Sequence, residues 1–147
     1  MRKNPFPPII PVAAAVIERQ GRILIARRCD KGPFNGKWEF PGGKIEPGET
    51  AEKCLVRELA EEFGITAVAG KRLTEVMHEY GTGTIRLIAI RVPRTTGRFV
   101  PTDHDRIVWV TPERLLDYDL APADLPVARL LAEKAASRAR RPRKAGP

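Results

Sequence analysis

The stretch GKIEPGETAEKCLVRELAEEFGI, residues 43–65, constrains the fold of this chain more than any other part of it. Its second half predicts an amphipathic helix. Thr50 can cap the N-terminus of that helix, Glu52 suits its first turn, and Gly64 is placed for a left-handed cap at its C-terminus. The apolar stripe that we expect to face a core consists of Leu55, Val56, Leu59 and Phe63.

The same helix carries three carboxylates, Glu58, Glu61 and Glu62, on an arc of about 100° beside the apolar stripe. Glu58 and Glu62 are four residues apart, a spacing at which like charges repel by about 0.2–0.5 kcal/mol in an isolated helix. A bound divalent cation turns that repulsion into attraction, and carboxylate oxygens are the ligands that Mg²⁺ prefers. Three glutamates alone are more often a solvated acidic face. The residues around them decide in favour of a metal site.

These glutamates stand at fixed distances from other residues. Gly43 is followed by five residues and Glu49, and Glu49 by seven residues and the run RELAEEFGI, residues 57–65. This pattern resembles the signature of the Nudix hydrolases at every defined position, and the resemblance extends from about Val12 to about Ala132. The chain looks closest to the MutT-like nucleoside triphosphate pyrophosphohydrolases. Two of its segments, 38–44 and 120–124, fall where that branch keeps its nucleotide-binding segments.

The resemblance implies a reaction assisted by Mg²⁺ or Mn²⁺, in which water attacks a phosphorus of a nucleoside triphosphate and releases a nucleoside monophosphate and pyrophosphate. The metal ligands that it implies are the carbonyl oxygen of Gly42 and the carboxylates of Glu58, Glu61 and Glu62. Glu58 is our choice for the residue that orients or deprotonates the water, with Glu61 as the alternative. We expect Arg57 to hold these carboxylates by a bidentate contact.

Further candidates lie outside the signature. Asp103 lies six residues before Trp109, where MutT-like enzymes often carry a glutamate that joins the metal site. Either a metal ligand or a polar loop residue fits this position. Arg28 and Lys44 suit the substrate phosphates, and Phe40 lies in one of the two nucleotide-binding segments. Trp109 is a candidate for stacking on the base, although a tryptophan in a short apolar strand is more often part of the core.

Asp124 is the residue that bears most on base specificity. Members that clear 8-oxoguanine nucleotides carry an asparagine here, whereas an ionised aspartate only accepts hydrogen bonds. An acceptor pairs with an exocyclic amino group such as N4 of cytosine. The run of residues 122–124, Pro-Ala-Asp, also resembles the members that prefer CTP, dCTP and 5-modified cytosine nucleotides. The other interpretation is that Asp124 caps the closing helix. His78 and Tyr80 share a strand face and are candidates for the same pocket, with a structural role favoured.

Length and composition are those of a small protein. At 147 residues the chain suits one domain with its own core. Two cysteines, Cys29 and Cys54, and no signal-peptide pattern indicate a reduced, cytoplasmic protein, and the apolar runs are far shorter than the roughly 20 residues that span a bilayer. Of the net charge of +8, residues 134–147 supply +6, which leaves 20 basic and 18 acidic residues elsewhere. A nearly neutral body argues against a nucleic-acid surface.

The order of predicted elements favours an α/β protein with the Nudix fold, a mixed β-sheet sandwiched between α-helices. We expect residues 1–11 to form an extended lead, residues 12–133 the Nudix hydrolase domain, and residues 134–147 a basic, disordered tail. Strands are predicted at 12–18, 22–28, 38–40, 85–92, 107–110 and within 65–80, where Gly70 marks a bulge. A loop is predicted at 93–106, a short helix from Thr111, and the closing helix at 125–137.

The sequence therefore predicts a cytoplasmic, metal-dependent pyrophosphohydrolase, monomeric or homodimeric, that acts on nucleoside triphosphates and favours cytosine nucleotides. An 8-oxo-dGTP diphosphatase is the alternative within that class. Hydrolysis of dinucleoside polyphosphates or ADP-ribose is less favoured, because those enzymes tend to carry marker residues downstream of the signature. The alternative of another class is a non-catalytic Nudix-fold regulator that binds nucleotides or RNA. The presence of every signature carboxylate argues against it.

Overall fold

The computed structural model describes residues 7–141, and within them seven strands form one mixed β-sheet. Its main path runs in the order β3 (Trp38–Glu39), β2 (Arg22–Arg28), β1 (Ile9–Arg19), β7 (Gly83–Val92) and β6 (Arg72–Tyr80). Two further strands pair off this path, β4 (Gly42–Lys44) with β1 and β9 (His104–Val110) with β2. A separate two-stranded sheet consists of β5 (Thr66–Val68) and β8 (Arg94–Thr96).

The parallel pair of β1 and β7 forms the centre of the sheet. It runs in register from Ile9 opposite Thr84 to Ile17 opposite Val92, whereas the other pairings are antiparallel. Residues 13–17 of β1 are fully buried, as expected of a strand covered on both faces. The predicted mixed sheet is confirmed.

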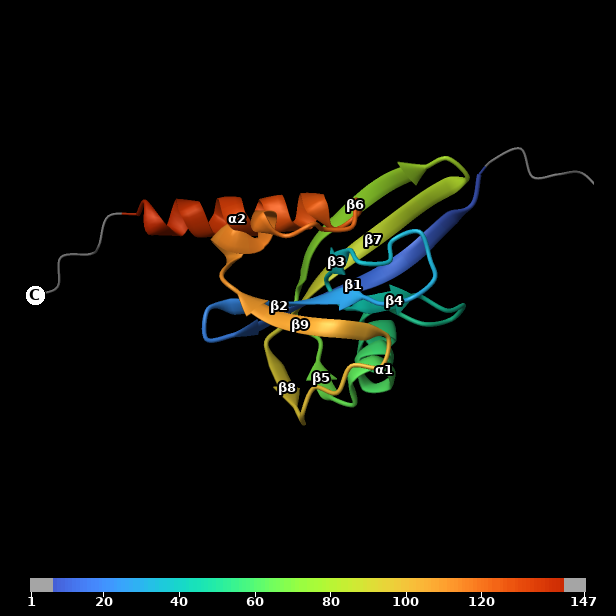
Figure 1. Cartoon of the computed structure of the whole chain (residues 1–147), viewed down its shortest axis with the longest axis horizontal. Helices are drawn as coiled ribbons and strands as arrows, with labels where there is room; N and C mark the ends of the chain where they lie inside the picture. The colour runs from blue at the N-terminus through green and yellow to red at the C-terminus, as the bar shows by residue number, and fades with distance from the viewer. Residues whose placement is uncertain (1–6, 142–147) are drawn as a thin grey trace, which may run out of the picture.

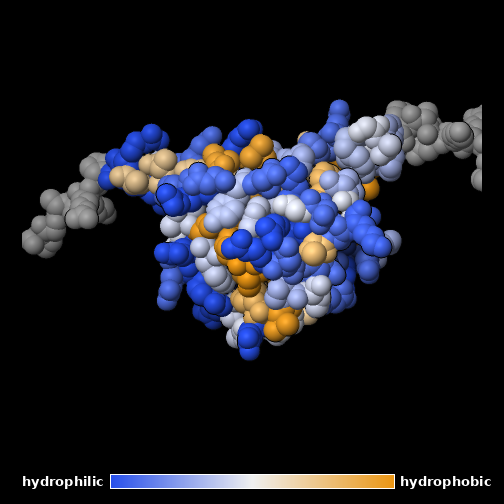
Figure 2. Space-filling model, viewed as in Figure 1, coloured by the Kyte–Doolittle hydropathy of each residue, from blue (hydrophilic) through white to orange (hydrophobic). Residues whose placement is uncertain are grey.

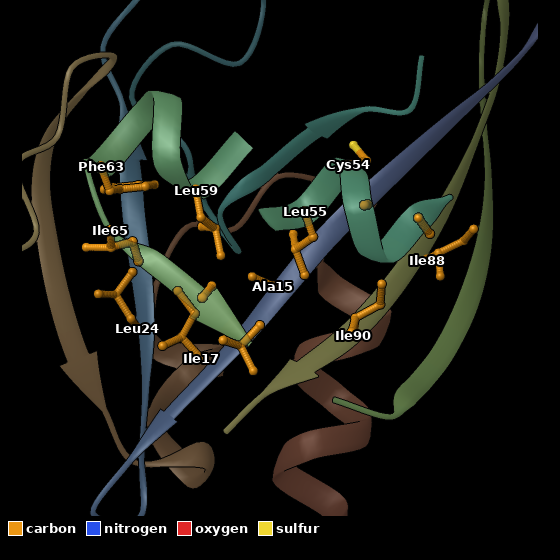
Figure 3. Packing of buried hydrophobic residues seen from close by; sticks show 14 of the residues in the cluster. Ala15, Ile17, Leu24, Cys54, Leu55, Leu59, Phe63, Ile65, Ile88 and Ile90 are labelled. Carbon is orange, nitrogen blue, oxygen red and sulfur yellow. The ribbon is translucent and has the colours of Figure 1, made fainter. Parts of the chain in front are cut away.

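A helix covers each face of this sheet, as Figure 1 shows: α1 (Ala51–Phe63) lies on one side and α2 (Leu125–Ala139) on the other. The side chains of β1 alternate between two hydrophobic clusters, with Ala15 and Ile17 on the α1 side and Val16 on the α2 side. Figure 3 shows Leu55, Leu59 and Phe63 of α1 together with residues of β1, β2 and β7 in the first cluster. Full burial of each such side chain contributes about 1.5–3 kcal/mol.

Helix α1 begins and ends where the local sequence predicts. Thr50 Oγ1 accepts a hydrogen bond from the Lys53 N–H at 3.1 Å, and Gly64 takes a left-handed conformation with φ of 69°. The predicted apolar stripe is only partly right, because Val56 is half-buried. Ala51 and Cys54 are buried instead, since this helix rests on the sheet with the face that carries them.

Several predicted boundaries in the sheet are wrong. β1 begins at Ile9, because the end of the predicted lead pairs with the start of β7. Residues 65–80 form two strands, β5 and β6, and Gly70 lies between them rather than in a bulge. Its N–H donates to the Arg91 carbonyl at 2.7 Å. The predicted loop at 93–106 contains β8 and the start of β9, which form only through pairing with distant strands.

The C-terminal part also differs from the prediction. The short helix is a 3₁₀-helix, η1 (Pro112–Asp117), and Thr111 makes no side-chain capping bond to it. Helix α2 continues to Ala139, so the boundary expected after residue 133 falls inside it. Residues 1–6 and 142–147, which complete the predicted lead and tail, lie outside the described part of the chain. In the described residues, neither helix has the length and apolarity of a membrane span. Hydrophilic residues cover most of the visible face in Figure 2.

Gly42→Ala should destabilise the fold by about 2 kcal/mol or more, because a Cβ there would lie 1.8 Å from the Ala13 carbonyl oxygen and push β4 away from β1. Gly81→Ala is the matched control, since nothing lies within 4 Å of a Cβ at that position. The measurement is urea denaturation of the metal-free variants. Equal free energies of unfolding for the two would contradict the close approach of β4 to β1.

Candidate active site

Arg57 organises the side chains of the signature. Its Nε and Nη2 donate to the two oxygens of Glu49 at 2.7 and 2.9 Å, and its Nη1 donates to Glu58 at 2.9 Å and to Glu61 at 3.2 Å. The predicted bidentate contact exists, but its partner is Glu49 on the turn before the helix. Because Arg57 binds the ionised form of Glu49, it lowers the pKa of that carboxyl to about 2.

Strand β4 approaches α1 closely at Gly43. A Cβ on Gly43 would lie 2.4 Å from the carboxyl carbon of Glu58, so glycine is required to leave room for that carboxylate. The Cys54 thiol contacts the same strand, with its Sγ 3.6 Å from the Gly43 carbonyl oxygen and 3.4 Å from that of Lys44. Burial raises the pKa of this thiol to about 12, which makes Cys54 a structural residue and not a nucleophile.

Glu62 has an unfavourable environment for an ionised carboxylate. Its Oε2 is buried and has no hydrogen-bond partner among the described residues. Burial, and then the negative charges of Glu58, Glu39 and Asp103, raise the pKa of Glu62 to about 8. A carboxylate buried beside like charges is destabilised until a cation neutralises it.

The loop after β8 brings Asp103 next to Glu62. Backbone N–H groups of Val100 and Thr102 donate to the carbonyls of Phe63 and Glu62 at 2.9 and 3.0 Å, so this loop is tied to the end of α1. Asp103 and Glu62 line a cavity of about 310 Å³, which we call the polar cavity. Its other lining residues are Arg28, Asp30, Glu39, Gly42 and His104.

These groups fit a hard divalent cation. Within residues 7–141, no three His, Cys, Asp or Glu side chains converge closely enough to coordinate an ion as they stand. Apart from His104, the side chains that could bind a metal ion around the polar cavity are carboxylates, among them Glu62 with its unpaired Oε2, and Mg²⁺ and Mn²⁺ prefer oxygen ligands. A cation bound there would also remove the repulsion between Glu62 and its neighbours.

A second cavity, of about 370 Å³, adjoins the first and is lined mostly by apolar residues. We call it the apolar cavity. Its apolar walls come from β1, β7 and the segment before α2, and include Ile10, Val12, Ile85, Leu87, Ala121 and Ala123. Arg28, Glu39 and Gly42 line both cavities. An apolar pocket of this size with a few polar groups suits a flat organic group such as a nucleobase.

Asp124 reaches the apolar cavity through a pairing between distant segments. Two backbone hydrogen bonds, from Trp38 N to Asp119 O and from Ala121 N to Trp38 O, both of 2.9 Å, join the segment before α2 to β3. This pairing places Asp124 beside Phe40, whose N–H lies 3.4 Å from Asp124 Oδ1.

The environment of Asp124 changes the chemistry expected of it. Asp124 stands at the N-cap position of α2, as one interpretation predicted, but its side chain makes no capping hydrogen bond to the helix. Burial, and then the negative charge of Glu39, raise the pKa of Asp124 well above its usual range, and this shift favours the neutral carboxyl group. A neutral carboxyl group donates as well as accepts hydrogen bonds. The ionised aspartate expected from the sequence only accepts them.

Most of the predicted substrate residues come together at the apolar cavity, but one does not. Arg28, Phe40, Lys44 and Asp124 line it, and so do His78 and Tyr80, for which a structural role was favoured. Trp109 lies elsewhere. Its ring lies 5.7 Å from the ring of Phe99 and 4.7 Å from the guanidinium of Arg19. It packs against the hydrophobic cluster on the α1 side of the sheet.

Sequence reasoning missed three polar residues of the site: Asp30, Glu39 and His104. Glu39 Oε1 accepts from Arg28 Nη1 at 3.1 Å and lies 3.8 Å from His104 Nε2. Asp30 Oδ2 accepts from Arg28 Nε at 3.0 Å. The His104 ring stacks on Phe63, and its buried Nδ1 has no partner among the described residues. The position of Glu39 inside a nucleotide-binding segment was the one available signal.

Comparison with known proteins places this geometry in a family. The family model described as the NUDIX domain matches residues 7–131. The CTP pyrophosphohydrolase of Escherichia coli strain K12 is 45% identical over 134 residues, which cover 91% of this chain and 97% of that protein. The 8-oxo-dGTP diphosphatase of the same strain is 35% identical over 117 residues, which cover 79% of this chain and 91% of that protein.

Solved structures agree with these relatives. The solution structure of the E. coli ORF135 protein is similar with a TM-score of 0.78 and 43% identity, covering 90% of this chain and 93% of that one. The crystal structure of the MutT protein from Methanosarcina mazei Go1 is similar with a TM-score of 0.77 and 27% identity, covering 95% of this chain and 100% of that one.

The carboxylate-bearing helix, the glycines of β4 packed against it and the mixed sheet are those of a divalent-metal-dependent hydrolase, and the chain belongs to the Nudix hydrolase family. Within that family it is a pyrophosphohydrolase related to the MutT proteins.

Glu62→Gln should stabilise the metal-free protein, and more so at about pH 9 than at about pH 5. The pKa of Glu62 rises from 4.5 to about 8 on folding, so the wild type loses stability as the pH rises through this window and the variant does not. The measurement is Tm in EDTA at both pH values. Added MgCl₂ should then raise the Tm of the wild type more than that of the variant. A variant no more stable than the wild type at about pH 9 would contradict an ionised, unpaired Glu62.

Proposed function

We propose that this enzyme hydrolyses nucleoside triphosphates, cytosine nucleotides foremost, to a nucleoside monophosphate and pyrophosphate, with Mg²⁺ as the cation and Mn²⁺ as a substitute. The observation that carries the proposal is the junction of the two cavities. An apolar cavity with Asp124 on its wall adjoins a polar cavity lined by Glu62 and Asp103. A nucleotide has the same two halves, a flat base and a chain of phosphates. The 45% identity to a CTP pyrophosphohydrolase supports the choice of base.

Residues of α1 and β4 and of the loop after β8 are proposed to position both the metal ion and the water. The proposed ligands are Glu58, Glu61, Glu62 and Asp103, with the carbonyl oxygen of Gly42. When bound, the cation supplies neutralising charge for the phosphates and lowers the pKa of a coordinated water. Glu58 suits the role of orienting the attacking water, because Arg57 and the close packing on Gly43 fix its carboxylate. Glu61 is 60% exposed and is held by one longer contact.

Two positively charged side chains near the cavities are suited to binding the substrate phosphates. Arg28 lines both cavities and Lys44 lines the apolar one. The Arg28 guanidinium binds Asp30 and Glu39 in this structure, so a phosphate would add to or replace one of these partners. Arg28 is thereby kept in place before substrate arrives.

A neutral Asp124 offers a donor beside an acceptor, which matches the N3 acceptor and the N4 amino donor of cytosine. Guanine presents a similar pair at O6 and N1, so hydrogen bonding at Asp124 alone does not separate the two bases. An 8-oxo-dGTP diphosphatase is therefore the second candidate, and the 35% identity to such an enzyme favours it over other substrates. The cytoplasm is the compartment we propose for either activity, because Cys29 and Cys54 are both free thiols.

The direct test is a comparison of kcat/KM with MgCl₂ for CTP, dCTP, 5-methyl-dCTP, 8-oxo-dGTP and ADP-ribose, with pyrophosphate and nucleoside monophosphate measured as products. The highest efficiency for a cytosine nucleotide supports the proposal. A higher efficiency for 8-oxo-dGTP replaces the base assignment and keeps the reaction. Binding without pyrophosphate release from any triphosphate would show that the chain is a regulator and not this enzyme.

Glu61→Gln should lower kcat by orders of magnitude at unchanged Tm, because it removes one charge from the metal site while its exposed side chain contributes little to packing. Glu46→Gln is the matched control. Glu46 is also exposed and lies 3.8 Å from Arg57, but it is not a proposed ligand, so its turnover should stay near that of the wild type. Near-normal turnover in Glu61→Gln would contradict the proposal that Glu61 is a metal ligand.

Asp124→Ala should lower kcat/KM for CTP roughly tenfold or more, the size of one good base contact. Asp124→Asn keeps a donor and an acceptor and should retain most of the efficiency.

The wild type should lose efficiency as the pH rises through the raised pKa of Asp124, because the ionised carboxylate cannot donate to N3. Asp124→Asn should not show this decline. The groups that act on Asp124 are Glu39, the Phe40 N–H and Arg28. The measurement is the pH profile of kcat/KM, and identical profiles would show that Asp124 does not donate to the base.

A further inference from the structure

Glu39 lies where the two cavities meet. Of the three residues that line both, it alone has an acceptor side chain; Arg28 only donates, and Gly42 has no side chain. Glu39 belongs to β3, where it pairs with Ala26 of β2, and its side chain is 13% exposed. A nucleotide that extends from Asp124 to the carboxylates of α1 must pass this junction with its sugar, because the sugar joins the base to the phosphates.

The carboxylate of Glu39 is engaged on one oxygen. Oε1 accepts from Arg28 Nη1 at 3.1 Å and lies 3.8 Å from His104 Nε2. No hydrogen-bond donor among residues 7–141 binds Oε2. The side chain is thus held in place by one oxygen while the other keeps its acceptor capacity. A fixed, mostly buried carboxylate of this kind is a strong acceptor for a hydroxyl group.

We infer that Glu39 accepts a hydrogen bond from a sugar hydroxyl of the nucleotide and so contributes to sugar specificity. This role presupposes that the enzyme takes nucleoside triphosphates, as proposed above. A role as a metal ligand fits less well, because the Arg28 guanidinium already pairs with Glu39 and would repel a metal ion at the same carboxylate. A role limited to holding Arg28 would leave Oε2 without a function.

The test compares CTP, dCTP and 2′,3′-dideoxy-CTP as substrates for the wild type and for Glu39→Ala. In the wild type, loss of the hydroxyl that Glu39 binds should lower kcat/KM roughly tenfold or more, as expected for a hydrogen bond to a charged group. A fall in kcat/KM from CTP to dCTP would show that Glu39 binds the 2′ hydroxyl. A fall from dCTP to 2′,3′-dideoxy-CTP would show that it binds the 3′ hydroxyl. In Glu39→Ala the same loss should have little effect, because the partner is already gone. Glu39→Gln keeps a carbonyl acceptor and should retain part of the discrimination.

Asp30→Ala is the matched control, because Asp30 binds the same guanidinium as Glu39 but lines the polar cavity alone. If Glu39 acted only through Arg28, both alanine variants would slow the three substrates by a uniform factor. Unchanged ratios among the three substrates in Glu39→Ala would overturn the sugar contact. So would a wild type that turns over all three equally well.

A separate readout keeps this test apart from the proposed function. Calorimetric titration of the same three nucleotides into Glu61→Gln, with MgCl₂ present, measures Kd ratios in a background where turnover should be slow. In Glu61→Gln, Kd should rise when the hydroxyl that Glu39 binds is missing. In the double variant Glu61→Gln/Glu39→Ala, the three Kd values should be nearly equal. If the enzyme prefers another base, the same sugar series with that base decides the role of Glu39. Failure to hydrolyse any triphosphate would overturn the function, whereas equal Kd values across the series would overturn the sugar contact.

Discussion

The ion pairs of Arg57 are the interaction on which the site depends. One guanidinium binds Glu49 on the turn and both Glu58 and Glu61 on the helix, so it joins two chain segments and separates carboxylates that would otherwise repel. Removing one member of such a partly buried set costs more than the net worth of the pair, because the remaining charges lose their partner. The cap at Thr50 and the left-handed Gly64 define the ends of α1, and Arg57 then fixes the turn against it.

At each end of the site, burial destabilises the ionised form of one carboxyl group. Glu62 by the polar cavity and Asp124 by the apolar cavity are buried carboxyl groups whose pKa values are raised, and the charge of Glu39 contributes to both shifts. Stability is often lower where groups are arranged for function, and these carboxyls are held by a well-packed sheet and helix around them. The negative charge of Glu39 thus disfavours ionisation at both ends of the site.

The parts of the structure that depend on neighbouring residues were predictable from the sequence, and those that depend on distant pairing were not. Thr50, Gly64 and the buried Leu59 follow from local propensity and helical periodicity, and the signature spacing identified the carboxylates of α1. β8 and the first residues of β9 exist because they pair with β5 and β2, which no local pattern reveals. The raised pKa of Asp124 has the same origin, since its burial results from the bridge between β3 and the segment before α2.

The parallel pairing of β1 with β7 has a consequence for how this chain is made. On the ribosome β1 can pair early with β2 and β4, which follow it closely, but its other edge must wait for β7. At about 5–20 residues per second, that wait lasts several seconds or more. During it the apolar residues 13–17 lie beside an unpaired strand edge, the kind of surface that aggregates or recruits chaperones. The centre of the finished enzyme is thus the part of the nascent chain that closes late, and its yield in the cell depends on how well that open edge is protected.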